Sequence, residues 1–237
     1  MTGIQDMEAH GIQAVVFDVL GTLVDELSGL RAGIREAAPW CDEASLDELT
    51  ALWQEHVARE QERVMQGDRA YAGSGTVDRE AARRVADRAG VTDAATVDRL
   101  ATAGQRLSPW EDSVAALERL AQWYPVLGLS NADRTALLRL SAHAGLRWHQ
   151  ALSAEAVQAY KPAPEVYRLA VDTAGCPPER ILMVAAHAWD LRGAQTAGLR
   201  TAYVGRPGGD PPERSDVFDW QGEELDELIT ALALKQR

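Results

Sequence analysis

Hydrophobic positions follow different patterns in different parts of the chain. Residues 12–18 form a short, largely β-branched apolar run that ends in Asp18. From about residue 27 to residue 102 the sequence is rich in Ala, Glu, Arg and Leu and carries no strand pattern. These patterns predict one buried strand, followed by a long block of helices.

Strand and helix patterns alternate from Trp110 onward. Short apolar runs predict strands, and longer amphipathic stretches closed by glycine predict helices. Glycine and proline residues between 205 and 219 predict a loop before the last helix. The predicted strands cover residues 124–130, 151–153, 181–185 and 201–205, and the predicted helices cover residues 134–144, 165–174, 189–197 and 223–234.

This order of elements predicts an α/β fold with a doubly wound, mostly parallel sheet. The helical block interrupts the sheet directly after its first strand. We therefore expect residues 27–105 to form an all-helical cap domain, and residues 1–26 and 106–237 to form the core domain. In such sheets the ligand lies beyond the carboxyl ends of the strands. The residues that follow the strands should share one rim beneath the cap: Asp18, Ser130, Asn131, Lys161 and residues 187–190.

Composition narrows the range of partners. The 237 residues carry a formal net charge of −12, which would repel nucleic acid and anionic membrane surfaces. No segment is apolar for the length that a bilayer requires, and residues 1–13 lack the pattern of a secretory signal. The two cysteines have no metal-ligand spacing, so we expect a reducing, cytoplasmic compartment. A homodimer is left open, because Trp40, Trp53 and Trp110 suit a cap core, a hinge or a dimer contact.

Four motifs occur in order along the chain: FDVLGT at 17–22, LSN at 129–131, YKPAPEVY at 160–167 and AAHAWD at 185–190. They resemble the four motifs of the haloacid dehalogenase superfamily, and the similarity covers essentially the whole chain. The resemblance implies a Rossmann-like core with a helical cap between the first and second motifs. Segments 160–162, 166–167 and 188–190 most resemble the L-2-haloacid dehalogenase branch.

The resemblance implies that Asp18 is a nucleophile. It would attack the carbon that bears the halogen, and water would then cleave the resulting ester at the aspartyl carbonyl. A departing halide needs no proton, so Leu20 can stand where phosphatases of the same superfamily place a second aspartate. Leu20 would then line the substrate pocket, in place of an aromatic residue often found there.

The fourth motif argues against a magnesium site. Phosphatases of the superfamily place several acidic residues there, because Mg²⁺ prefers hard oxygen ligands. In this chain Ala186 stands four positions before Asp190, which leaves one carboxylate. Leu20 and Ala186 together favour chemistry at carbon without a metal or other cofactor. A magnesium-dependent small-molecule phosphatase is kept as one alternative, and a catalytically silent binding protein as another.

Other motif residues each have a structural and a functional interpretation. Thr22 follows a turn glycine and either bonds its own backbone or supports Asp18. Ser130 and Asn131 either start the next helix, or hold a substrate carboxylate, or do both. Lys161 lies on a stiff, proline-flanked segment, and the resemblance implies that it pairs with Asp18 and keeps it ionised. Tyr167 lies inside a predicted helix, as a half-buried structural residue or as a substrate contact.

His187 and Asp190 complete the set of expected catalytic residues. An imidazole at position 187 can activate the hydrolytic water near neutral pH, and its other interpretation is a hydrogen bond to the adjacent loop. The resemblance implies that Asp190 orients the water or Lys161. Trp189 is expected to be a packing residue.

The sequence of the cap does not identify the leaving group of the reaction. Dehalogenases of this type usually grip the halide with an arginine on the first cap helix, and Gln54 occupies that place here. Four nearby arginines could substitute for it: Arg31, Arg35, Arg59 and Arg63. Exposed arginines on amphipathic helices are nevertheless mostly solvated. We therefore expect a hydrolase that converts a small 2-haloalkanoic acid to the 2-hydroxy acid. Another leaving group, such as a ring nitrogen of a strained small molecule, is kept as an alternative.

Overall fold

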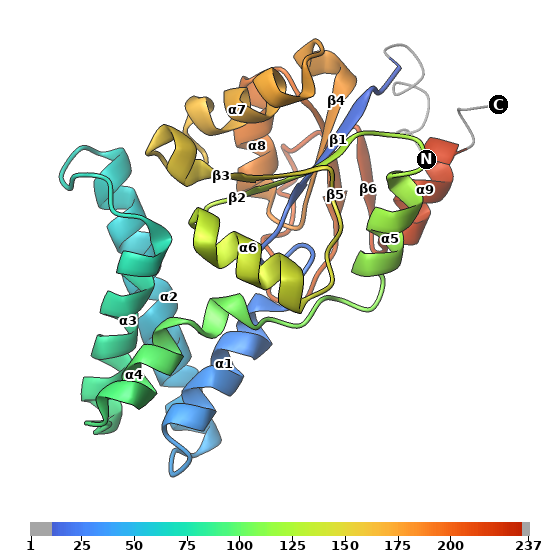
Figure 1. Cartoon of the computed structure of the whole chain (residues 1–237). Helices are drawn as coiled ribbons and strands as arrows, with labels where there is room; N and C mark the ends of the chain where they lie inside the picture. The colour runs from blue at the N-terminus through green and yellow to red at the C-terminus, as the bar shows by residue number, and fades with distance from the viewer. Residues whose placement is uncertain (1–10, 234–237) are drawn as a thin grey trace.

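A computed structural model of the chain describes residues 11–233. Over these residues the strands form one parallel sheet in the order β3-β2-β1-β4-β5-β6 (Figure 1). The strands are β1 Ala14–Asp18, β2 Val126–Ser130, β3 Gln150–Ser153, β4 Ile181–Ala185, β5 Arg200–Val204 and β6 Trp220–Gly222. The predicted α/β fold with a doubly wound sheet is confirmed.

Helices cover both faces of the sheet (Figure 1). Helices α5 (Ser113–Leu120), α6 (Arg134–His143) and α9 (Leu225–Ala233) pack on one face. Helices α7 (Pro164–Ala174) and α8 (Ala188–Thr196) pack on the other face. Because both faces are covered, the central strands are buried throughout and apolar up to the polar residues Asp18 and Ser130 that end β1 and β2.

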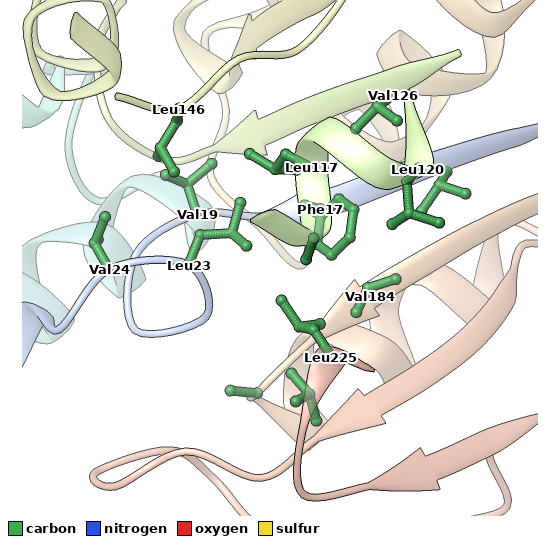
Figure 2. Packing of buried hydrophobic residues seen from close by; sticks show 14 of the residues in the cluster. Phe17, Val19, Leu23, Val24, Leu117, Leu120, Val126, Leu146, Val184 and Leu225 are labelled. Carbon is green, nitrogen blue, oxygen red and sulfur yellow. The ribbon is translucent and has the colours of Figure 1, made fainter. Parts of the chain in front are cut away.

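The two faces draw on alternate residues of the same strand. Val15 and Phe17 of β1 point into the core beneath α5 and α9, whereas Ala14 and Val16 point toward α7 and α8. Figure 2 shows the first of these cores, in which Phe17 lies among side chains from α5, β4 and the start of α9. The packing on both faces fixes the register of β1 and the direction in which Asp18 leaves the sheet.

The helical block after β1 forms a separate layer beside the sheet (Figure 1). Its helices are α1 (Glu26–Ala37), α2 (Glu43–Met65), α3 (Ser74–Ala89) and α4 (Ala94–Ala101). Aspartate side chains cap three of these helices, at residues 25, 42 and 93. The block has an apolar core of its own, which includes Ile34, Leu46 and Trp53. We keep residues 27–105 as the proposed cap domain, with residues 1–26 and 106–237 as the proposed core domain; residues 1–10 lie outside the described part of the chain.

Hydrogen bonds tie the cap to the core near the start of α3. The Tyr160 hydroxyl donates to the Ala72 carbonyl at 2.6 Å, and the Asp133 backbone N–H donates to Ser74 Oγ at 2.8 Å. Within the core, Trp110 Nε1 donates to the Gly21 carbonyl at 3.1 Å and so joins the two segments between which the cap is inserted. The first two contacts hold the cap against the loops that follow β2 and β3.

The predicted strands and helices of the core begin within two residues of the observed ones, but several short elements were not predicted, helix α5 among them. The short strand β6 was not predicted, because three residues carry too little alternation to be recognised. Tyr124 and Pro125 precede β2 instead of belonging to it. Three short 3-10 helices were also not predicted: η2 (Ala103–Gln105), η3 (Ala154–Val157) and η4 (Pro178–Arg180). The last helix begins at Leu225, two residues later than expected, and its predicted end at residue 234 lies outside the described residues.

The three tryptophans considered for a dimer contact have different surroundings. Trp53 is buried in the cap core, and Trp110 lies at the hinge, where the Arg206 guanidinium sits 5.7 Å from its ring centroid. Trp40 is exposed, and its indole N–H donates to the Ala89 carbonyl. Between residues 11 and 233, no helix has both the length and the apolar character needed to cross a bilayer.

The sheet order identifies where a ligand should bind. The chain passes from β1 outward to β2 and β3, then returns to β4 on the other side of β1. The crevice between the ends of β1 and β4 is therefore the switch point at which open α/β sheets bind their ligands. Asp18 ends β1 and His187 follows β4, so both residues lie at this crevice.

A close contact between α7 and α8 gives a test of this packing. A Cβ atom added at Gly193 would lie 2.4 Å from Tyr167 Oη and 2.8 Å from Pro162 Cβ. We expect Gly193→Ala to lower the free energy of unfolding by about 1–3 kcal/mol, as overpacking of a core does. Urea denaturation measures this. Gly104→Ala is the control, because an added Cβ there meets nothing within 4 Å; equal stability of the two variants would contradict the packing.

Candidate active site

Asp18 lies at the carboxyl end of β1, with both carboxylate oxygens engaged. Lys161 Nζ donates to Asp18 Oδ1 at 2.9 Å, and Thr22 Oγ1 donates to Asp18 Oδ2 at 2.7 Å. Burial by itself would raise the pKa of Asp18, but the charges of Lys161 and His187 and these hydrogen bonds hold the pKa below its ordinary value. Asp18 is therefore an ionised carboxylate in a largely buried position, as a nucleophile requires.

Lys161 is shared between two carboxylates. Its Nζ also donates to Asp190 Oδ2 at 2.8 Å, and the side chains of Lys161 and Asp190 are both buried. Burial opposes the charged amine, but Asp18 and Asp190 keep the pKa of Lys161 above its ordinary value. The expected pairing of Lys161 with Asp18 is present, and Asp190 holds the amine from a second side.

Tyr167 supports Asp190 from behind. Its hydroxyl donates to Asp190 Oδ1 at 2.6 Å and lies 3.1 Å from the Asp190 carbonyl oxygen. Tyr167 is fully buried, not half-buried as expected, and it is absent from the described cavity wall. Burial raises the pKa of Asp190, with Lys161 and the Tyr167 hydrogen bond opposing this rise. The structure thus places Tyr167 next to Asp190 and away from the cavity.

The Thr22 hydroxyl bridges two motifs. It donates to Asp18 and accepts a hydrogen bond from the Ala186 backbone N–H at 2.9 Å. Ala186 is fully buried directly after β4, where its methyl group packs in the core. Thr22 therefore fixes Asp18 relative to the fourth motif. Its hydroxyl supports Asp18 and does more than stabilise its own turn.

Ser130 ends β2, Asn131 follows it, and both line the cavity. Neither caps the next helix, because the side chain of Asp133 accepts from the Ala136 N–H in that role. Ser130 Oγ accepts from the Ala132 N–H at 3.1 Å, and Asn131 Oδ1 accepts from the Lys161 N–H at 2.9 Å. The Asn131 oxygen therefore positions the Lys161 segment, and its amide N–H groups stay available to a ligand.

His187 lies against the turn that follows β1. Its Nε2 is 3.3 Å from the Leu20 carbonyl oxygen, and its ring stacks near Trp189 with centroids 5.9 Å apart. When Nε2 carries the proton and donates to this carbonyl, Nδ1 carries the lone pair. Gly21, at φ +76°, is required here, because an added Cβ would lie 2.7 Å from Nε2 of the imidazole.

The residues surround a cavity of about 370 Å³ between the core and the cap. Of the expected site residues, Asp18, Leu20, Ser130, Asn131, Lys161, His187 and Gln54 line it. Trp189 also lines the cavity, so the expectation that it only packs was wrong. Apolar cap residues such as Leu30 and Trp53 complete the wall. A cavity of this size suits a small organic molecule.

No arginine takes the place of the one expected to hold a halide. Gln54 lies on α2, not on the first cap helix, and the four arginines considered as substitutes are all absent from the described cavity wall. Arg31 and Arg35 pair with Glu43, whereas Arg59 and Arg63 pair with Glu60. The described structure thus favours the other interpretation, in which these arginines lie on charged helix faces away from the cavity.

Two acidic residues that the sequence analysis missed line the cavity, Glu26 and Asp78. Glu26 is the first residue of α1, where an acidic residue is ordinarily explained by the helix dipole. Asp78 lies on α3 beside Val77 and one turn from Ala81 and Ala82, which are buried. A carboxylate next to the apolar face of a helix is the signal by which Asp78 could have been found. Within residues 11–233, no group of three or more His, Cys, Asp or Glu side chains is arranged to hold a metal ion.

The capped parallel sheet and the buried carboxylate held by lysine define a class of enzyme: hydrolases that use an aspartate nucleophile beneath a helical cap. A family model described as haloacid dehalogenase-like hydrolase matches residues 12–198. The chain belongs to this family, and it is a hydrolase.

Similar proteins agree with this assignment. An (S)-2-haloacid dehalogenase of Pseudomonas putida is 32% identical, over 83% of this chain and 87% of its own. An (S)-2-haloacid dehalogenase of Burkholderia cepacia is 31% identical, over 94% of this chain and 95% of its own. The crystal structure of an L-2-haloacid dehalogenase from Xanthobacter autotrophicus with chloropropionic acid covalently bound has a TM-score of 0.81 and 26% identity, and covers 94% of this chain and 98% of its own.

The contact between Tyr167 and Asp190 can be tested by one substitution. Tyr167→Phe removes the hydroxyl that donates to Asp190, so we expect the free energy of unfolding to fall by about 1–3 kcal/mol. We also expect kcat to fall while KM stays unchanged, because Tyr167 contacts Asp190 and not the cavity. Urea denaturation and steady-state kinetics measure the two effects.

Tyr203→Phe is the matched control, since the described residues give that hydroxyl no hydrogen-bond partner. A rise in KM for Tyr167→Phe with unchanged stability would instead identify Tyr167 as a substrate contact.

Proposed function

We propose that the chain catalyses the hydrolytic dehalogenation of a small 2-haloalkanoic acid to the 2-hydroxy acid. The observation that carries this proposal is the Asp18 carboxylate, held by Lys161 and Thr22 at the wall of the cavity, with Leu20 two positions later. A halide leaves as a stable anion and needs no proton, so an apolar side chain suffices at that position. The similarity to (S)-2-haloacid dehalogenases supports the same chemistry.

The first step is a displacement at carbon. A carboxylate oxygen of Asp18 forms a bond to C2 of the substrate, and the carbon–halogen bond breaks with its electron pair leaving on the halide. Lys161 and Thr22 each occupy one direction on an Asp18 oxygen, which aims the remaining lone pairs. The product of this step is an ester in which an Asp18 carboxyl oxygen is bonded to C2 of the alkanoic acid, in keeping with the covalently bound chloropropionic acid of the Xanthobacter relative.

The second step is hydrolysis of that ester. Water attacks the Asp18 carbonyl carbon, so that the carboxylate re-forms and the 2-hydroxy acid leaves. We assign the removal of the water proton to His187, whose Nδ1 is the free nitrogen when Nε2 donates to the Leu20 carbonyl. We assign to Asp190 the holding of Lys161 through both steps.

The substrate carboxylate requires hydrogen-bond donors next to the nucleophile. We assign this role to Ser130 and to the Asn131 amide, which line the cavity after β2. Gln54 and Leu20 would contact the rest of the substrate. We propose that no cofactor takes part, because Ala186 replaces an acidic residue where the phosphatase alternative would need a magnesium ligand.

We also propose a cytoplasmic location and no nucleic-acid partner, on the grounds of the two unpaired cysteines and the net charge of −12. A homodimer is compatible with the exposed Trp40 and stays a proposal.

The activity can be measured directly. We expect release of chloride from (S)-2-chloropropionate together with an equal amount of lactate, and no effect of a metal chelator. Asp18→Asn should lower the rate by at least about 10³-fold, as removal of a nucleophile does. Asp87→Asn, an exposed position on α3, is the matched control and should keep the wild-type rate.

Two results would count against the proposal. Full turnover by Asp18→Asn would exclude an aspartyl ester. Hydrolysis of p-nitrophenyl phosphate that appears with Mg²⁺ and disappears with chelator, in the absence of chloride release, would favour the phosphatase alternative.

A further inference from the structure

Glu26 and Asp78 are acidic side chains on the cavity wall that the proposed mechanism does not use. Both are partly shielded from solvent. Within the described residues, neither carboxyl group forms a hydrogen bond or an ion pair. Each is therefore available to a ligand in the cavity, with no partner to give up first.

Within the described residues, no lysine or arginine forms an ion pair with Glu26 or Asp78. Glu26 interacts electrostatically with Asp18 and His187, and Asp78 interacts with Glu26 and Asp133. Lys161, the one lysine or arginine on the described cavity wall, is already shared by two carboxylates, Asp18 and Asp190. The Asp133 carboxylate accepts from the backbone N–H groups of Gly75 and Ala136. An anion that enters the cavity thus meets two unpaired acidic groups.

These surroundings favour the protonated forms. Burial raises the pKa of Glu26 to about 7, with His187 opposing the rise and Asp18 adding to it. Burial raises the pKa of Asp78 to about 8, and the charges of Glu26 and Asp133 add to the rise. An anionic substrate would raise both pKa values further, since a like charge disfavours the carboxylate. A carboxyl group that keeps its proton is a hydrogen-bond donor.

We propose that the protonated carboxyl groups of Glu26 and Asp78 donate hydrogen bonds to the halide that Asp18 displaces, in a cavity whose described wall contains no arginine. This inference rests on the proposed dehalogenation. The new bond joins an Asp18 oxygen to C2, the electron pair of the carbon–halogen bond leaves on the halide, and the two carboxyl protons stay on their oxygens. The pair therefore acts as a neutral donor site for an anion, and it works only below the pH at which its protons are lost.

Bromide binding to the free protein tests the pair without any turnover. We expect the dissociation constant of bromide to rise at least tenfold between about pH 6.5 and about pH 9. Binding that requires a protonated group weakens about tenfold for each pH unit above the pKa of that group. Tryptophan fluorescence measures this, since Trp53 and Trp189 line the cavity. His187 also lines the cavity, so variants are needed to assign the pH dependence to Glu26 and Asp78.

The double variant Glu26→Gln, Asp78→Asn keeps amide donors of similar shape but cannot titrate. We expect it to bind bromide with less than about threefold change over the same pH range, whereas Glu26→Ala, Asp78→Ala should bind at least tenfold more weakly at pH 6.5. His187→Asn should keep the pH dependence of the wild-type protein. Glu118→Gln, an exposed change on α5, is the control for a carboxylate outside the cavity. Circular dichroism checks that each variant is folded.

An unchanged pH dependence in the Gln and Asn double variant would overturn the proposal. So would binding of a small cation, with ethylammonium as the probe, that tightens as pH rises, because it would assign the pair to a positively charged substrate group. Absence of chloride release by the wild-type protein would count against the proposed function, and is distinguishable because bromide binding needs no catalysis.

Discussion

The structure depends on one buried ammonium group shared by two carboxylates. Lys161 lies between Asp18 and Asp190, at 2.9 Å and 2.8 Å, and all three side chains are largely removed from water. Burying such charges costs several kcal/mol per ion and is tolerated only when each finds good partners. Thr22 and Tyr167 supply those partners at the two ends. The arrangement keeps Asp18 ionised although burial removes the water that would otherwise stabilise its charge. The chemistry requires this ionised form more than the stability of the fold does.

The cap completes this site with a different kind of wall. The core contributes charged and hydrogen-bonding groups at the ends of β1, β2 and β4, whereas the cap contributes many apolar side chains. Two unpaired acidic groups join this second wall: Asp78 of the cap, and Glu26 at the boundary between core and cap. Hydrogen bonds from Tyr160 and Asp133 of the core to Ala72 and Ser74 of the cap hold the two walls on either side of one cavity. Asp18 can thus be ionised close to two carboxyl groups that keep their protons. Burial raises the pKa of all three groups, but only Asp18 has Lys161 beside it to lower its pKa again.

The rim of the sheet could be predicted from sequence because it follows from topology. Asp18 and Ser130 each end a short strand, His187 follows another, and parallel strands end at one edge. The Tyr167–Asp190 contact could not be predicted, since it depends on how closely α7 approaches α8 at Gly193. The position of Glu26 on the cavity wall could not be predicted, because an acidic residue in the first turn of a helix is ordinarily explained by the helix dipole. Local pattern thus locates strand ends, but not the contacts that depend on helix packing or on the surroundings of a buried charge.

The central claim is that Asp18 forms an ester that water cleaves at the aspartyl carbonyl. A single turnover in H₂¹⁸O, with enzyme in excess over (S)-2-chloropropionate, tests it most directly. The account predicts that ¹⁸O appears in the peptide that contains Asp18, while the lactate formed carries an oxygen from the original carboxylate. Recovery of ¹⁸O in the lactate, with an unlabelled Asp18 peptide, would contradict the account, because water would then have attacked the substrate carbon itself.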